Sequence, residues 1–220
     1  MGLRERKKAQ TRQLIGETAW RLFADRGFER VTVAEVARLA DVAPATVFNY
    51  FPTKEDLFYS RLEAFGARLL EAVAAREPGE PVLAAFRRQL LESGGLLASV
   101  EAGDAQALQR LRTVNQVIAA SPALLARERQ AIAGTADALA GLLVAEGGDA
   151  ADHVGAQAAA NALLGVQRAL IDFTRRRVLA GDDAARLAAE VRQRGEDAFA
   201  LLEHGLGGYA PRPPRPTGPS

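Results

Sequence analysis

Side chains that commonly carry out catalysis or bind metals are sparse in this chain of 220 residues. It contains no cysteine, which excludes disulfides, thiolate metal sites and cysteine nucleophiles. The two histidines, His153 and His204, have no second histidine at metal-ligand spacing and no motif-like nucleophile nearby. No glycine-rich phosphate loop follows a strand pattern. We therefore predict no enzyme, no metal site and no cofactor.

A different group of residues, between positions 43 and 54, has chemistry suited to DNA. If Val47 and Phe51 turn inward, the residues left to face DNA are Ala45, Thr46, Asn49 and Tyr50. Small residues let the backbone approach the bases, and the polar ones can bond phosphates or touch a thymine methyl. Lys54 adds positive charge at a helix start that already favours anions. The same spacing also fits a helical hairpin with a solvated polar face.

Two short helices must position this group. Thr32 is placed to cap a helix near 33–40, and Glu35 completes a capping box. Pro44 suits the first position of a helix near 44–50, which must end before Pro52. Two short helices joined by a three- or four-residue turn form a helix-turn-helix, here at about 33–51, whose second helix enters the major groove.

The rest of the chain also has the composition and periodicity of helices. Helices are predicted near residues 8–26, 33–40, 44–50, 54–76, 81–99, 104–119, 122–146, 150–179 and 183–204. No segment shows sustained strand alternation, so we predict an all-α fold of about nine helices. The short helices come first and the long ones follow, which indicates a small N-terminal module and a C-terminal helical bundle.

The charge distribution adds a basic N-terminal arm to this scheme. Residues 1–60 contain ten Lys and Arg against eight Asp and Glu, although the whole chain carries a net charge of only +1. The excess lies mainly at the start of the chain, where one glutamate accompanies Arg4, Arg6, Lys7 and Lys8. Such a cluster either contacts nucleic acid or is a solvated tail.

One long run of sequence resembles the DNA-binding domain of TetR-type regulators. It extends from Thr11 to Phe58 and reads TRQLIGETAWRLFADRGFERVTVAEVARLADVAPATVFNYFPTKEDLF. Its most specific pieces are LFADRGFERVTV, EVARLADV and TVFNYFPTKEDLF. The resemblance implies a homodimer on double-stranded operator DNA, with phosphate contacts at Thr32 and Lys54. It also implies base or phosphate contacts among Ala43, Pro44, Ala45, Thr46, Phe48, Asn49 and Tyr50.

Three positions depart from the pattern of that family. Asp41 stands where glycine is usual, although aspartate tolerates a left-handed backbone better than most residues. Ala43 replaces a common Ser or Thr cap, and Phe48 replaces a common tyrosine. The second helix of the helix-turn-helix, the recognition helix, therefore has few side-chain hydrogen-bond donors. We expect phosphate contacts, DNA shape and the basic arm to contribute more of the binding.

The domain boundaries follow from these patterns. We predict a basic arm at 1–10, a helix-turn-helix domain at 11–58, a ligand-binding and dimerisation bundle at 59–208, and a disordered proline-rich tail at 209–220. No apolar run approaches 18 residues and the N-terminus lacks an apolar signal core, so we expect a cytoplasmic protein that does not contact membranes.

Polar residues set among apolar ones in the long helices are the candidates for a ligand site. They are Thr113, Asn115, Gln116, Asn161, Gln167 and Asp172. Buried amides need partners, which a ligand or a neighbouring helix can supply, and some of these residues can also be exposed. Phe65, Phe86 and Phe173 are expected in the core, and Trp20 at the contact between the first and fourth helices. Ala/Arg-rich C-terminal halves like this one imply, by the same resemblance, a small lipophilic or acyl-type effector.

The last two predicted helices are suited to self-association. One carries the small residues Gly155, Ala159, Ala160 and Gly165 among the apolar residues Leu163, Leu164, Val166, Leu170 and Phe173. The other carries Leu187, Val191, Phe199 and Leu202. Two such helices from each of two subunits can form a symmetric four-helix interface, unless both faces are used within one chain. The resemblance favours the dimer.

The sequence therefore predicts a repressor that leaves its operator when a small molecule binds. An activator of the same fold, or a non-catalytic helical dimerisation or adaptor protein, are the alternatives.

Overall fold

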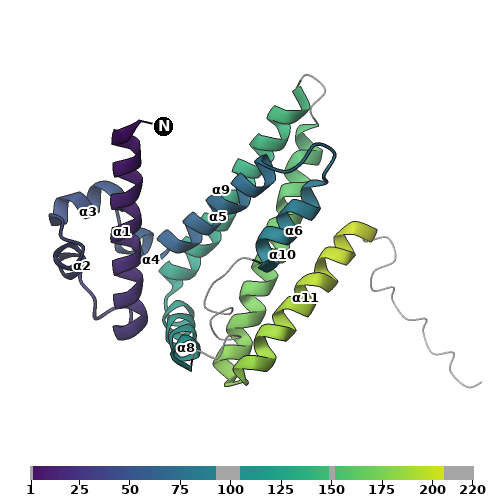
Figure 1. The fold of residues 1–220 in the computed structure, drawn as a ribbon. Coiled ribbons are helices and arrows are strands. Elements are labelled where there is room, and N and C mark those ends of the chain that lie inside the picture. The colour runs from purple at the N-terminus through teal and green to yellow at the C-terminus, as the bar shows by residue number, and fades with distance from the viewer. Residues whose placement is uncertain (1, 93–104, 149–151, 206–220) are drawn as a thin grey trace, which may run out of the picture.

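The computed structural model describes residues 2–92, 105–148 and 152–205, and within these ranges all regular secondary structure is helical, with no strand. The helices are α1 (Leu3–Arg26), α2 (Val33–Leu39), α3 (Pro44–Tyr50), α4 (Lys54–Phe58), α5 (Ser60–Ala74), α6 (Val82–Glu92), α8 (Ala105–Ala120), α9 (Pro122–Gly147), α10 (His153–Ala180) and α11 (Ala184–His204). Figure 1 shows α1–α3 on one side of a bundle of long helices. The predicted all-α class is confirmed.

Helix α1 begins much earlier than the sequence pattern suggested. It starts at Leu3 instead of near residue 8, so the basic residues expected in an arm lie on the first turns of the helix. The reason is local, because residues 3–10 read LRERKKAQ and consist almost entirely of strong helix formers. Their positions are therefore fixed relative to the rest of α1.

The helix predicted over 54–76 is interrupted at Tyr59. The structure has a five-residue α4, then Tyr59 at φ −87° and ψ 6°, and then α5. Tyr59 is buried and its ring packs edge-on against Phe58 at a centroid distance of 5.1 Å. The two adjacent aromatic residues are both buried, and the chain bends between the short and the long helix. This break raises the number of helices in the described residues to ten.

Two large apolar clusters hold the molecule together. The first contains Phe23, Phe28 and Phe58 from the N-terminal module, and it also includes Ile118 from α8 and Leu124 from α9. Bundle helices thus complete the core of the N-terminal module.

The second cluster lies within the bundle and joins α5, α6, α9, α10 and α11. Its largest fully buried members are Phe86, Phe199, Leu69 and Leu139. Phe86 is a core residue, as predicted. The proline-rich tail at 209–220, and the parts of the predicted helices at 93–99, 104 and 150–151, lie outside the described residues.

The capping box predicted from the sequence at Thr32 and Glu35 is present. The Thr32 hydroxyl accepts a hydrogen bond from the Glu35 amide at 3.2 Å, and the Glu35 carboxylate accepts one from the Thr32 amide at 3.1 Å. Thr53 and Asp56 form the same arrangement at the start of α4. The backbone hydrogen bond from Thr32 is the largest cause that holds the pKa of Glu35 below its usual 4.5.

Replacing Thr32 by alanine is expected to lower the free energy of unfolding by about 1 kcal/mol, because the Glu35 amide at the start of α2 loses the hydroxyl that accepts its hydrogen bond. Thr32→Ser keeps the hydroxyl and is expected to retain most of the stability. Urea denaturation of the two variants checks this, and equal stability of Thr32→Ala and the parent chain would show that the cap contributes nothing.

No helix in the described part of the chain is both long enough and apolar enough to cross a membrane.

Candidate DNA interface and bundle cavity

Helix α3 has one buried face and one exposed face, as the sequence predicted. Val47 and Phe51 are each only 1 % exposed and anchor the helix to the N-terminal core. Thr46 and Tyr50 are half-buried at the edges of the outward face, which also carries Ala43, Pro44, Ala45, Phe48 and Asn49. Phe48 is 50 % exposed, although it is a large apolar side chain. The surface that α3 offers is therefore mostly small and apolar.

The turn that orients α3 depends on Asp41. Its φ of 53° makes it the one non-glycine residue with a left-handed backbone in the described part of the chain. Ala43 at the N-cap makes no side-chain hydrogen bond to the start of α3. Aspartate in place of glycine at position 41 thus still allows the left-handed turn before α3. Alanine at position 43 leaves α3 without a side-chain cap.

Lys54 and Thr32 flank this surface at the starts of α4 and α2. The ammonium group of Lys54 lies 4.3 Å from the centre of the Phe28 ring, which holds the half-buried side chain in place. The Thr32 side chain is exposed, but its hydroxyl is engaged with Glu35 in the cap. The starts of helices present backbone amide groups that favour phosphate groups.

The exposed basic residues at the start of α1 extend the same region. Arg12 donates a hydrogen bond from its guanidinium to the Tyr50 carbonyl at 2.8 Å, so this side of α1 lies against the C-terminal end of α3. Residues four apart share a helix face, which places Lys8 and Arg4 on the face of Arg12, one and two turns further out respectively. Arg6 and Lys7 are also exposed.

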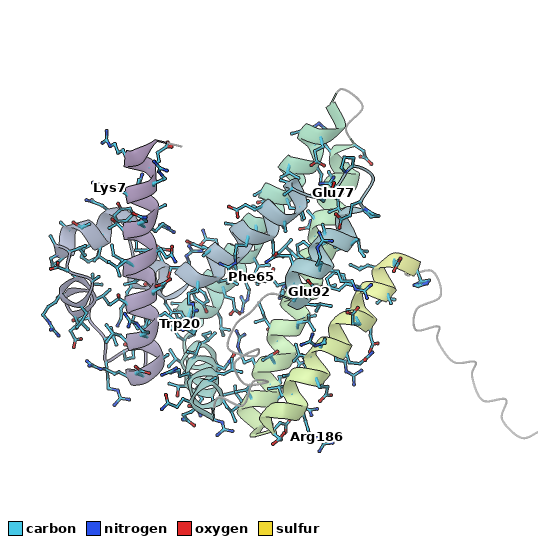
Figure 2. All side chains as sticks on the ribbon, in the orientation of Figure 1. Lys7, Trp20, Phe65, Glu77, Glu92 and Arg186 are labelled. Carbon is cyan, nitrogen blue, oxygen red and sulfur yellow. The ribbon has the colours of Figure 1, made fainter. Side chains whose placement is uncertain are left out.

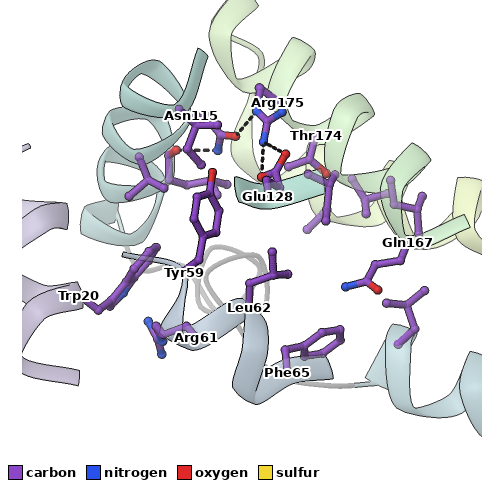
Figure 3. A pocket seen from close by; sticks show the side chains of 18 of the residues that line it. Trp20, Tyr59, Arg61, Leu62, Phe65, Asn115, Glu128, Gln167, Thr174 and Arg175 are labelled. Atoms are coloured by element: carbon purple, nitrogen blue, oxygen red, sulfur yellow. Dashed lines mark hydrogen bonds and ion pairs between the residues drawn. The ribbon is translucent and has the colours of Figure 1, made fainter. Parts of the chain in front are cut away.

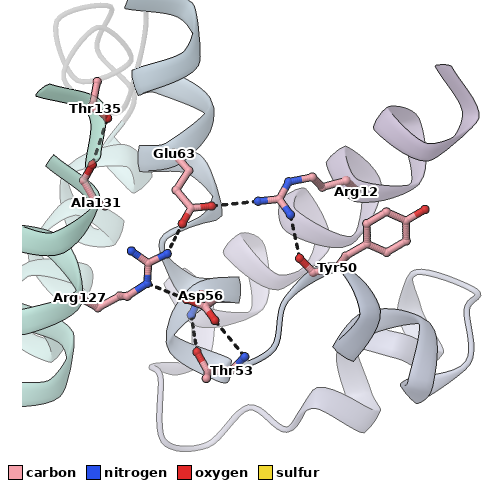
Figure 4. A network of polar contacts seen from close by, with 8 residues as sticks. All are labelled: Arg12, Tyr50, Thr53, Asp56, Glu63, Arg127, Ala131 and Thr135. Carbon is pink, nitrogen blue, oxygen red and sulfur yellow. Dashed lines mark hydrogen bonds and ion pairs between the residues drawn. The ribbon is translucent and has the colours of Figure 1, made fainter. Parts of the chain in front are cut away.

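A network of ion pairs connects this region to the bundle (Figure 4). The Arg12 guanidinium also contacts the Glu63 carboxylate of α5 at 2.9 Å. Glu63 forms a second ion pair with Arg127 of α9, and Arg127 also contacts the Asp56 carboxylate of α4 at 2.6 Å. The end of the recognition helix is therefore linked to α9 through three side chains.

The bundle contains a cavity of about 430 Å³ close to the N-terminal module. Most of its wall is apolar and includes Trp20, Leu62, Phe65, Leu111 and Ile171. Figure 2 shows Trp20 on the side of α1 that faces the bundle, as predicted, whereas Lys7 lies near the N-terminal end of that helix. The volume falls within the range of small-molecule sites, about 300–1,000 Å³.

One end of the cavity carries a buried polar cluster (Figure 3). Arg175 of α10 donates from one guanidinium nitrogen to both carboxylate oxygens of Glu128, at 2.8 and 2.6 Å. It also donates to the Asn115 side-chain oxygen at 3.3 Å, and the Asn115 amide donates to the Leu111 carbonyl at 2.8 Å. All three polar residues are buried.

Two further polar atoms at the cavity have no hydrogen-bond partner among the described residues. They are the Tyr59 hydroxyl and the side-chain oxygen of Gln167, and both are buried. Burial is the main reason that the pKa of Tyr59 is raised, and the Glu128 carboxylate adds to the shift. Tyr59 therefore stays protonated and able to donate. An unpaired buried polar group costs free energy that a ligand can recover.

Only part of the predicted ligand set lies at this cavity. Asn115 and Gln167 line it. The other predicted residues, Thr113, Gln116, Asn161 and Asp172, are not in its wall. Gln116 and Asn161 are exposed, and the Thr113 hydroxyl donates to the Gln109 carbonyl of its own helix. Asp172 instead lies 3.5 Å from Arg175 in an ion pair.

The aromatic residues predicted for the core also lie partly at the cavity and partly in apolar clusters. Phe65 lines the cavity, contrary to the prediction that it is a core residue, although it also packs against the second cluster. Phe173 packs against a third small cluster with Leu111 and Val178.

Sequence reasoning missed Tyr59, Glu128 and Arg175, although a signal for Glu128 was present. It lies four residues from both Leu124 and Ile132, so a carboxylate occupies the buried face of α9.

The apolar residues predicted for a subunit interface are mostly used inside the chain. Those that are buried within it are Ala160, Leu163, Leu164, Val166, Leu187 and Phe199. Leu170 and Val191 line the cavity instead. The outer face of α10 exposes the small residues Ala158, Ala159, Ala162, Gly165 and Ala169. The dimer stays a prediction, and of the small residues predicted for its interface Ala159 and Gly165 remain exposed.

These features define a helix-turn-helix module of the DNA-binding class joined to a helical bundle, and comparison with known proteins agrees. Residues 15–60 match the family model described as bacterial regulatory proteins, tetR family. The N-terminal domain of this chain therefore belongs to the TetR family, and the resemblance noted in the sequence is confirmed.

Individual relatives match over part of the chain. The regulator TcmR of Streptomyces glaucescens is 35 % identical over 85 residues, which are 39 % of this chain and 38 % of TcmR. LuxR of Vibrio harveyi is 52 % identical over 46 residues, 21 % of this chain and 22 % of LuxR. The chain thus spans well under half the length of these relatives.

Among solved structures, a transcriptional regulator from Rhodococcus sp. Rha1 has a TM-score of 0.48 and 22 % identity, over 88 % of this chain and 96 % of that protein.

Proposed function

We propose that the chain is a homodimeric, DNA-binding regulator of transcription, and specifically a repressor that leaves its operator when a small molecule occupies the cavity. One observation carries the proposal: α3, inside the segment that matches the TetR family, presents an exposed face beside two capped helix starts and a basic helix end. The relatives TcmR, LuxR and BetI are all described as HTH-type transcriptional regulators.

A mobility-shift assay on the DNA upstream of its own gene tests this function directly. A regulator of this class gives specific retardation that weakens with salt, because phosphate contacts release counterions. A helical adaptor protein gives none. The sign of regulation then follows from a reporter gene placed behind the bound site.

Lys54→Gln and Tyr50→Ala are expected to weaken operator binding while the fold is kept, because both residues lie at the proposed interface. Loss of Lys54 should act almost uniformly across DNA sequences and lower the salt slope by about one. Arg194→Ala removes a charge from α11, which lies on the other side of the molecule from α3, and serves as the control (Figure 1). Unchanged affinity in both interface variants would exclude this face.

Neutralising the first turns of α1 is expected to weaken binding and its dependence on salt. The variant replaces Arg4, Arg6, Lys7 and Lys8 by glutamine, which is as good a helix former as lysine and so keeps α1 intact. Each lost phosphate contact lowers the salt slope by about 0.9 on B-DNA. An identical salt titration for the variant and the parent chain would leave these residues without a role in binding.

Coupling between the cavity and the DNA-binding face has a structural basis in α9. Glu128 faces the cavity, and the adjacent Arg127 holds α4 and α5 through Asp56 and Glu63. A dimer has to present its recognition helices about 34–36 Å apart to reach successive major grooves. A ligand that shifts α9 or α5 changes this spacing, and the coupling free energy of such systems is commonly about 1–3 kcal/mol.

Linkage makes the coupling reciprocal, so saturating operator must weaken ligand binding by the factor by which ligand weakens operator binding. Titration of a cavity ligand with and without operator measures it. Equal ligand affinities would exclude release by that ligand even where DNA binding is established.

A further inference from the structure

The charged side chains around the cavity are strongly unbalanced. Four arginines belong to its wall, Arg61, Arg68, Arg175 and Arg192, against the single carboxylate of Glu128 among the described residues. Arg175 and Glu128 neutralise each other through two short hydrogen bonds. What remains, at Arg61 and Arg68, is a positive excess beside a space whose wall is otherwise mainly apolar.

Arg61 and Arg68 are the two arginines of this set that lie on α5. They make no ion pair or hydrogen bond with any other residue that the structure describes. Each is instead held over an aromatic ring of the cavity wall: the Arg61 guanidinium carbon lies 4.9 Å from the centre of the Trp20 ring, and that of Arg68 lies 5.6 Å from the Phe65 ring. Both side chains reach solvent, which places them at the mouth.

The two guanidinium groups also affect each other. Burial against the wall is the largest cause that lowers the pKa of Arg61, the Glu17 carboxylate opposes the shift, and the positive charge of Arg68 adds to it. An anion close to both groups would relieve this repulsion and replace part of the lost hydration. A guanidinium is well suited to the task because its planar donors match the two oxygens of a carboxylate.

The interior of the cavity indicates the polarity of the part of the ligand that lies beyond its head group. Behind the two arginines the wall consists largely of apolar side chains such as Leu62, Leu170 and Ile171. A ligand with a cationic head group would be repelled by the positive charge of Arg61 and Arg68. Glu128 would attract it only weakly, because both carboxylate oxygens already accept hydrogen bonds from Arg175. We propose that the effector site, which itself rests on the proposed function, takes an apolar carboxylate whose anionic group lies at Arg61 and Arg68 and whose apolar body fills the cavity.

The test uses three ligands that differ in the head group alone: decanoate, 1-decanol and decyltrimethylammonium, each below its micelle-forming concentration. Octanoate, dodecanoate and 2-naphthoate extend the carboxylate series to other shapes. Calorimetry measures affinity on the full chain. Trp20 is the single tryptophan of the protein and lines the cavity, so its fluorescence reports whether the ligand binds there.

At least one carboxylate is expected to bind about tenfold more tightly than its neutral analogue, with a change in Trp20 emission, and the ammonium compound more weakly still. Arg61→Gln and Arg68→Gln should each reduce carboxylate affinity about tenfold and leave decanol affinity unchanged. Arg129→Gln is the matched control, because it removes an exposed positive charge on α9 that does not line the cavity.

Equal affinity for decanoate and decanol, preferred binding of the ammonium compound, or no binding across the carboxylate series would each overturn the proposal. Operator binding is measured separately on the same preparations. Carboxylate binding without any effect on operator affinity contradicts release by ligand and leaves the ligand class standing. Operator binding without carboxylate binding overturns the proposed ligand class and leaves the proposed DNA-binding function standing.

Discussion

Arg175→Met is expected to lower the free energy of unfolding by about 3–5 kcal/mol, the largest effect of any single substitution considered for this protein. Its side chain and that of Glu128 are each only 10 % exposed and form the ion pair at the polar end of the cavity. Without Arg175 the Glu128 carboxylate stays buried with no cation, and the Asn115 oxygen also loses its donor. The penalty comes mainly from these stranded groups and not from the loss of the ion pair itself.

The double variant Glu128→Leu/Arg175→Met separates the two contributions. It leaves no buried charge, and we expect it to recover most of the lost stability, because apolar replacement of a buried pair is often neutral or stabilising. Urea unfolding at one fixed protein concentration measures both variants, since a dimer makes stability depend on concentration. A loss of less than about 1 kcal/mol in Arg175→Met would show that water or a rearrangement solvates Glu128.

Arg127→Ala is expected to cost about 1–3 kcal/mol of stability at neutral pH and to flatten the dependence of stability on pH. Burial by itself would raise the pKa of Asp56, but hydrogen bonds from Arg127 and Thr53 outweigh it and hold the pKa below the usual 3.8. A depressed carboxyl pKa in the folded state contributes stability above the unfolded-state value, and this is lost as pH falls through the folded-state value. The parent chain should therefore lose stability steeply below pH 3.8.

In the variant, Asp56 loses its principal cation, its pKa rises, and the stabilisation is already missing at neutral pH. Chemical denaturation at several pH values between neutrality and the acid transition measures the slope. Arg129→Ala is the control, because Arg129 is exposed two residues further along α9. If Arg127→Ala keeps the acid slope of the parent chain, Asp56 is stabilised by its cap with Thr53 and the ion pair contributes nothing.

The parts of the fold that the sequence predicted correctly are those with local causes. Thr32 with Glu35 and Pro44 with Pro52 define the ends of α2 and α3 through hydrogen bonds and steric limits that act within a few residues. The break at Tyr59 has no such signal. Residues 54–76 have continuous helix propensity, and the bend arises only when Phe58 and Tyr59 are both buried against other helices.

The two candidate sites differ in the same respect. The outward face of α3 follows from the inward positions of Val47 and Phe51, which periodicity reveals. The cavity is formed where α1, α4, α5, α6, α8, α9, α10 and α11 approach one another, so its wall depends on tertiary packing. The amides Asn115 and Gln167 were predicted because they interrupt apolar runs. Glu128 and Arg175 were missed because charged residues are usually exposed, and only the positions Leu124 and Ile132 marked a buried face.

Tyr59 has a consequence for how strongly different ligands act. Its backbone is the joint between α4 and α5, and its side chain is part of the cavity wall. A five-residue helix is about 7 Å long, so a rotation of about 10° at the joint moves the far end of α4 by about 1 Å and moves α3 further. Both subunits of the proposed dimer contribute the displacement. Under the proposed mechanism, efficacy and affinity are therefore separate properties of a ligand, because two compounds that bind equally tightly can turn this one residue through different angles.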